Sequence, residues 1–110
     1  DVTNINKRYF PVKLTAEDET GETHTTVVEV GPPKIKMLRE LMDIAQKASK
    51  DENEVNIIKK LRDIIKKMLS KNKSGYKVPD AYVEAMDIDE LFGLLNAYFK
   101  WLAEAKNDPN

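Results

Sequence analysis

Hydrophobic and polar residues alternate in the first third of the chain. One stretch carries hydrophobic side chains at every second position: Phe10, Val12, Leu14 and Ala16. A second stretch, residues 23–30, is rich in β-branched residues, and both features are typical of strands with one buried face. The polar segment 17–22 between them contains Gly21, which can adopt the positive φ of a tight turn. The pattern predicts an antiparallel β-hairpin at about 7–30, whose apolar face must pack on helices to be stable.

The hydrophobic period changes at Gly31, Pro32 and Pro33. Beyond this point hydrophobic residues recur every three or four positions, the spacing of amphipathic helices. A proline in the first turn of a helix loses nothing, because its missing N–H would have had no partner there. The spacing predicts three main helices, at about 33–49, 53–71 and 88–106, and a short helical turn that starts at Pro79 and Asp80 and runs through Met86. We therefore predict an α+β fold, with an N-terminal antiparallel β-hairpin packed on a bundle of three main α-helices.

The length of 110 residues indicates a single domain, 1–110, which is large enough to form a core without metals or disulfides. Within it we expect the hairpin in 1–31, the helical part in 32–106 and a polar tail at 107–110. The chain has no cysteine, which excludes disulfides and thiol chemistry. Its apolar runs are far shorter than the ~20 residues of a membrane span, so we expect a soluble protein without membrane contact.

The net charge of −1 hides an uneven distribution of charge. Residues 55–77 carry eight Lys and Arg side chains against one acid, Asp63, whereas the segment from Asp80 onward carries seven acids against two lysines. We interpret the lysines as a solvated helix face, with an acidic partner protein as the alternative, and the two segments have the charges to attract each other. Nucleic-acid-binding domains are usually basic and offer several aromatic side chains for stacking, but this band has Tyr76 alone. We predict no nucleic-acid partner.

Residues with catalytic potential are scarce. The single histidine, His24, stands in a threonine-rich strand with no cysteine or carboxylate at ligand spacing, so we interpret it as a solvent-facing residue. Asp87 and Glu90 have the spacing of a capping box ahead of an apolar helix, not that of a calcium loop. The glycines form no phosphate-binding motif. The sequence predicts no catalytic residues, metal site or cofactor, and hence no enzyme.

The last helix is apolar over about 180°, which exceeds the ~100° stripe that burial in one core requires. Its large side chains at the centre and borders of this arc are Phe92, Leu94, Tyr98, Phe99 and Trp101. The surplus surface has three candidate occupants: another helix of the same domain, an identical subunit, or a client polypeptide. We take these five residues as the candidate protein-binding site, with Leu94 and Trp101 on one border and Phe92 and Phe99 on the other. Two unpaired strand edges add to the exposed adhesive surface, so we also expect a homo-oligomer.

Four segments of the chain resemble the tail assembly chaperones of long-tailed phages and prophages of Gram-positive bacteria. They are KRYFPVKL at 7–14, KMLREL at 36–41, YVEAMDIDEL at 82–91 and LLNAYFKW at 94–101. The resemblance covers nearly the whole chain through hydrophobic spacings and a leucine-rich helix start.

This resemblance implies a non-enzymatic protein of the host cytoplasm that is absent from the finished virion. Such a protein coats the tape measure protein while the tail tube polymerises around it, which makes the tape measure protein the expected partner and the tail tube protein a further candidate. A longer frameshifted form is typical of the family. Two alternatives remain open: a structural subunit of the phage tail or head–tail junction, and a small interaction protein that acts on a host target.

Overall fold

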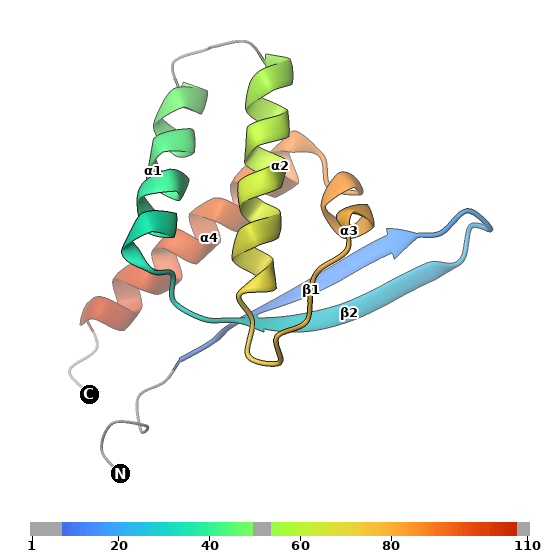
Figure 1. The fold of residues 1–110 in the computed structure, drawn as a ribbon, viewed down its shortest axis with the longest axis horizontal. Coiled ribbons are helices and arrows are strands. Elements are labelled where there is room, and N and C mark those ends of the chain that lie inside the picture. The colour runs from blue at the N-terminus through green and yellow to red at the C-terminus, as the bar shows by residue number, and fades with distance from the viewer. Residues whose placement is uncertain (1–7, 50–53, 108–110) are drawn as a thin grey trace.

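The computed structural model describes residues 8–49 and 54–107, in which an antiparallel β-hairpin is followed by four helices (Figure 1). In chain order the elements are β1 (Phe10–Glu17), β2 (Thr23–Val30), α1 (Ile35–Ser49), α2 (Glu54–Ser70), α3 (Asp80–Glu84) and α4 (Ile88–Asn107). This order confirms the predicted α+β fold, and the predicted boundaries agree to a few residues. The predicted hairpin start at residue 7, the connection between the helices predicted at 33–49 and 53–71, and residues 108–110 of the predicted tail lie outside the described residues.

The hairpin closes through a short glycine-containing loop. β1 and β2 pair antiparallel over their full length. Beyond them the N–H of Asp18 donates to the carbonyl of Glu22 at 2.9 Å, and the N–H of Gly21 donates to the carbonyl of Asp18 at 3.0 Å. Gly21 has a φ of 86°, which is the left-handed conformation that a three-residue hairpin loop needs at its last position. Glycine adopts this conformation without a steric penalty.

The outer edge of β2 is partly covered by the loop that follows α2. The carbonyl of Glu29 accepts a hydrogen bond from the N–H of Lys73 at 2.8 Å. The N–H of Gly31 donates to the carbonyl of Lys71 at 3.0 Å. Because the N–H and C=O of a strand residue point to the same side, the odd-numbered residues of β2 direct their backbone away from β1. Pro11 lies opposite Glu29, so it occupies an outward position on β1, where a missing N–H interrupts no ladder.

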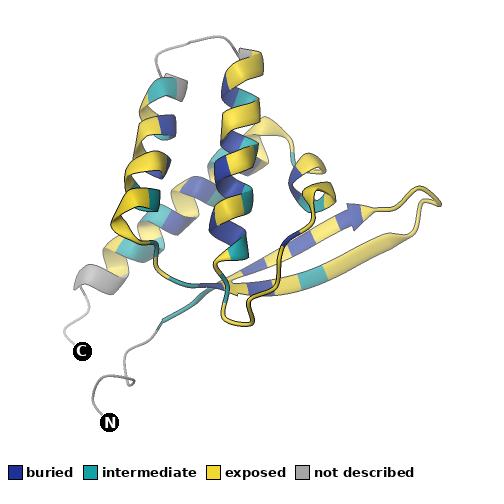
Figure 2. Cartoon of the chain, viewed as in Figure 1, coloured by how far each residue is buried: buried dark blue, intermediate teal, exposed yellow. Residues whose placement is uncertain are grey.

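The core lies between the inner face of the hairpin and the helices (Figure 2). The strands contribute their even-numbered residues: Val12, Leu14, Ala16, Val28 and Val30. α1 and α2 lie side by side, and α4 crosses behind them (Figure 1). α2 is the central helix, because it contacts α1, α3, α4 and β2 and buries six hydrophobic residues: Ile57, Leu61, Ile64, Ile65, Met68 and Leu69. Within residues 8–49 and 54–107, no helix combines the length and hydrophobicity required to cross a membrane.

α4 begins with the predicted capping box. The N–H of Glu90 donates to Oδ1 of Asp87 at 2.8 Å, and the N–H of Asp87 donates to Oε1 of Glu90 at 3.0 Å. The two side chains thus satisfy two backbone donors that no helical carbonyl can reach. This reciprocal pair fixes the position at which α4 starts.

Replacing Asp87 with alanine is expected to lower the free energy of unfolding by about 0.5–2 kcal/mol, because the cap of α4 is lost. Asp89→Ala is the matched control, since Asp89 is equally exposed in the same turn but makes no capping bond. Chemical denaturation of both variants measures the difference. Equal destabilisation by the two substitutions would contradict a capping role for Asp87.

Candidate functional site

The structure divides the apolar arc of α4 into a buried centre and two half-buried borders. Leu91, Leu95 and Tyr98 form the centre and have no accessible surface. The other four candidate residues are partly buried and pack against the core: Phe92, Leu94, Phe99 and Trp101. Most of the apolar arc therefore packs against other parts of the same domain. Packing within the domain was one of the three alternatives that the sequence left open.

Tyr98 belongs to the core. Its hydroxyl donates to the carbonyl of Gly31 at 2.8 Å, and burial raises the pKa of the phenol above its ordinary value. The bond joins the C-terminal helix to the end of the second strand. Because Tyr98 is fully buried, a partner has nothing of this side chain to contact, and we remove it from the candidate binding site.

Trp101 is also engaged within the domain. Its ring lies 5.7 Å from that of Phe10 and 5.6 Å from that of Tyr98, measured between centroids. The guanidinium carbon of Arg8 lies 5.6 Å from the centroid of the Trp101 ring, within the range of a cation–π interaction. Trp101 thus fastens the start of β1 to α4. Its replacement would disturb the fold as well as any binding surface.

The opposite border of α4 makes no comparable aromatic contact in the described part of the chain. It consists of Phe92 and Phe99, with Ile88 one turn before Phe92. Ile88 is 36% exposed, and both phenylalanines are partly accessible. We call these three residues the α4 border. Leu94 and Trp101 on the other border are partly accessible as well, so the α4 border differs from it by its exposed neighbour Ile88 and by the lack of a ring-to-ring contact among the described residues.

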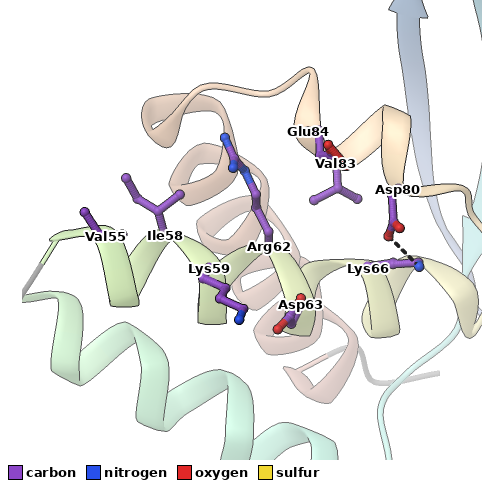
Figure 3. A pocket seen from close by; sticks show the side chains of 9 residues that line it. All are labelled: Val55, Ile58, Lys59, Arg62, Asp63, Lys66, Asp80, Val83 and Glu84. Carbon is purple, nitrogen blue, oxygen red and sulfur yellow. Dashed lines mark ion pairs between the residues drawn. The ribbon is translucent and has the colours of Figure 1, made fainter.

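A groove between α2 and α3 was not predicted from the sequence (Figure 3). Its volume is about 540 Å³. Its apolar lining comes from Val55, which is 75% exposed, and from Ile58 and the buried Val83. The available signal was the broad apolar face of the helix predicted at 53–71, to which Ile58 belongs together with Ile57 and Leu61. An apolar face wider than one packing surface leaves side chains at its border.

Charged side chains surround this groove. Lys66 pairs with Asp80 across it (Figure 3), and Arg62 rises from α2 toward the α3–α4 connection. The Nε of Arg62 is buried and has no hydrogen-bond partner among residues 8–49 and 54–107. Cations and anions line the groove in equal numbers, so it presents no single sign of charge: Lys59, Arg62 and Lys66 against Asp63, Asp80 and Glu84.

The lysine band at 59–77 is partly neutralised by acids of other elements. Lys67 lies 3.9 Å from Glu40 on α1, and Lys73 lies 3.9 Å from Glu29 on β2. The pair of Lys66 and Asp80 realises the expected attraction between the basic and acidic segments. A strip of lysines interrupted by acids is a poor match for the continuous charge of a phosphate backbone.

His24 is exposed, as predicted, but it does have a carboxylate partner, which corrects the sequence-based view. Its Nε2 lies 2.7 Å from Oδ2 of Asp18. Oδ1 of Asp18 accepts bonds from the hydroxyl of Thr20 at 2.6 Å and from the N–H groups of Thr20 and Glu22. The Thr20 hydroxyl and the His24 ring lower the pKa of the Asp18 carboxyl below its ordinary value. The turn brings the pair together, because Asp18 is the first residue after β1 and His24 is the second residue of β2.

Asp18, Glu22 and His24 offer ligand atoms that all lie within 4.8 Å of one another. All three residues are exposed. Each oxygen of Asp18 is already used in the turn, so these contacts account for the cluster as a structural feature of the hairpin.

Comparisons with protein-family models, curated proteins and solved structures found no match to this chain. Function is therefore proposed from the residues and contacts of the chain, together with the resemblance of its sequence segments described above.

Proposed function

We propose that this protein is a non-enzymatic interaction domain that binds an apolar, helical segment of another protein. The observation that carries the proposal is the α4 border, where Ile88, Phe92 and Phe99 line one side of a helix without being fully buried. Large apolar side chains at a helix border supply contact area at low cost in side-chain entropy, and a partner helix can bury them in a groove-like contact.

The resemblance to tail assembly chaperones supports a specific client. We propose the tape measure protein of a long-tailed phage as that client, with binding in the host cytoplasm before the tail tube closes around it. Tape measure contact at the α4 border would shield apolar surface on both proteins during assembly. The lysine band would assist encounter with acidic client segments, an effect that weakens with salt.

Phe99→Ala is expected to weaken binding to the tape measure protein by at least about tenfold, since a central aromatic contact carries roughly 1.4 kcal/mol or more. The measurement is co-purification of the two proteins from co-expressing cells, followed by titration. Phage that carry the variant should give lysates with few or short tails.

Lys100→Ala is the matched control, because Lys100 is the next residue on α4 and lies on its exposed face. Circular dichroism must first show that both variants are folded. A folded Phe99→Ala protein that binds the tape measure protein like the wild type would refute the site. Normal tails after deletion of the whole gene would refute the chaperone function. Presence of the protein in purified virions would favour a structural tail or head–tail subunit.

A further inference from the structure

The outer edge of β2 is open toward the tip of the hairpin. Thr23, Thr25 and Val27 are odd-numbered, so their N–H and C=O groups point away from β1, as those of Glu29 do. The loop after α2 bonds to Glu29 and Gly31 but reaches no further, and in the described part of the chain no other backbone segment bonds to this edge. The hairpin arm extends beyond the helices (Figure 1).

The two edges of the sheet differ in their protection. The outward positions of β1 include Pro11, Lys13 and Glu17, and proline and charged residues are the usual means of preventing strand addition. Helix α3 also packs near β1. Residues 23–28 of β2, by contrast, read Thr-His-Thr-Thr-Val-Val and contain neither proline nor lysine. β2 therefore presents the edge that favours pairing with another strand.

We propose that two copies of this chain pair through β2, antiparallel, around a two-fold axis at Thr25. In this register Thr25 lies opposite Thr25 of the second copy, and Thr23 lies opposite Val27 of the second copy. All of these residues direct their backbone outward, so each N–H faces a carbonyl across the interface. The product is a four-stranded sheet, which overcomes the marginal stability of a two-stranded one.

Charge complementarity identifies a second copy as the occupant. The same register places residue 21 of one copy opposite residue 29 of the other, so the turn of each copy meets the loop after α2 of its partner. The turn and the last residue of β1 carry four acids: Glu17, Asp18, Glu19 and Glu22. The loop carries three exposed lysines, of which Lys73 also lies 3.9 Å from Glu29 of its own chain: Lys71, Lys73 and Lys77. Two-fold symmetry produces this attraction twice. The loop after α2 bonds to β2 only at Glu29 and Gly31. In the proposed register this end of β2 lies opposite the turn of the second copy, so the loop does not block the paired strands.

The interface is small. One strand edge and two charged contacts bury less than the roughly 1,200–2,000 Å² of stable complexes, so the dimer should dissociate on dilution and in high salt. The proposed dimer interface lies on a different face from the α4 border. The dimer can therefore be tested independently of client binding.

Thr25→Pro removes the central outward N–H while leaving the β1–β2 ladder intact, as Pro11 does on the other strand. Thr15→Pro is the matched control, because Thr15 lies opposite Thr25 and points outward on β1. Sedimentation at about 0.5 mM should show a dimer for the wild type and for Thr15→Pro, and a monomer for Thr25→Pro. A wild-type protein that stays monomeric up to that concentration would overturn the proposal.

Single-cysteine variants test the register even if a proline variant fails to fold. The chain has no native cysteine, so any covalent dimer reports the introduced position alone. Residues paired by hydrogen bonds lie about 5.5 Å apart at Cα, within reach of a disulfide or a short cross-linker. Thr25→Cys should therefore cross-link to completion at about 0.5 mM. Thr15→Cys should not cross-link. Cross-linking through position 15 but not 25 would place the interface on β1 and overturn the proposal.

Discussion

Replacing Tyr98 with alanine is expected to lower the free energy of unfolding by about 3–5 kcal/mol. The side chain has no accessible surface. Its ring stacks on that of Trp101 and is tilted against that of Phe10, with a centroid distance of 5.6 Å to each. Alanine would leave a cavity where α4 meets the start of β1. It would also strip the carbonyl of Gly31 of its 2.8 Å hydrogen bond. A loss of this size is a large share of the roughly 5–15 kcal/mol that stabilises a small domain.

Tyr98→Phe separates the two contributions. It keeps the ring and removes only the hydroxyl, so we expect a loss of about 1–2 kcal/mol. Tyr76→Ala serves as the control, since Tyr76 is 39% exposed in the loop after α2. Equilibrium unfolding in urea measures all three variants. If Tyr98→Ala proved no less stable than Tyr76→Ala, Tyr98 would not be the residue that joins α4 to the hairpin.

The parts of the fold that were predictable are those encoded by neighbouring residues. The alternation in 10–16 and the change of hydrophobic period at Gly31 depend on residues close in sequence. The strands and helices of the structure lie at the positions that these patterns predicted. The capping box was readable for the same reason, because Asp87 and Glu90 are three positions apart. Glycine at position 21 likewise identified the turn.

Contacts between distant residues were not predictable in this way. Tyr98 and Gly31 are 67 positions apart, and nothing near Tyr98 in the sequence distinguishes a core tyrosine from a surface one. The same limit applied to the candidate site. The arc of α4 predicted which residues would be apolar, but it did not show that Trp101 would pack against Phe10 while Phe92 and Phe99 make no ring-to-ring contact among the described residues.

The role of Ile58 depended on helix order. The sequence shows a broad apolar face at 57–69. Predicting which of its residues are buried required knowing that α2, and not α4, is the central helix. α2 contacts α1, α3 and α4, but in its first turns Val55 stays exposed and Ile58 is only partly buried. Val55 and Ile58 consequently line an open groove instead of the core (Figure 3).

Asn72 organises the loop that covers β2, although the sequence marks this segment only as a loop. Its Nδ2 donates to the carbonyls of Leu69 at 2.8 Å and Tyr76 at 2.7 Å. Its Oδ1 accepts bonds from the N–H of Tyr76 at 2.9 Å and from the hydroxyl of Ser74 at 3.1 Å. One amide thus holds the end of α2 and both sides of the loop. An asparagine is suited to this because it combines two donors with an acceptor.

Asn72→Ala is accordingly expected to lower the free energy of unfolding by about 1–3 kcal/mol, since four hydrogen bonds lose their side-chain partner. The amides of Gly31 and Lys73, which bond to Lys71 and Glu29 across the edge of β2, should also exchange with solvent faster. Asn96→Ala on the exposed face of α4 is the control. Hydrogen exchange followed by NMR separates a local opening of the loop from global unfolding, because only a local opening spares the amides of β1. Unchanged exchange at Gly31 and Lys73 in a destabilised Asn72→Ala protein would show that the side chain stabilises α2 alone and does not hold the loop against the strand.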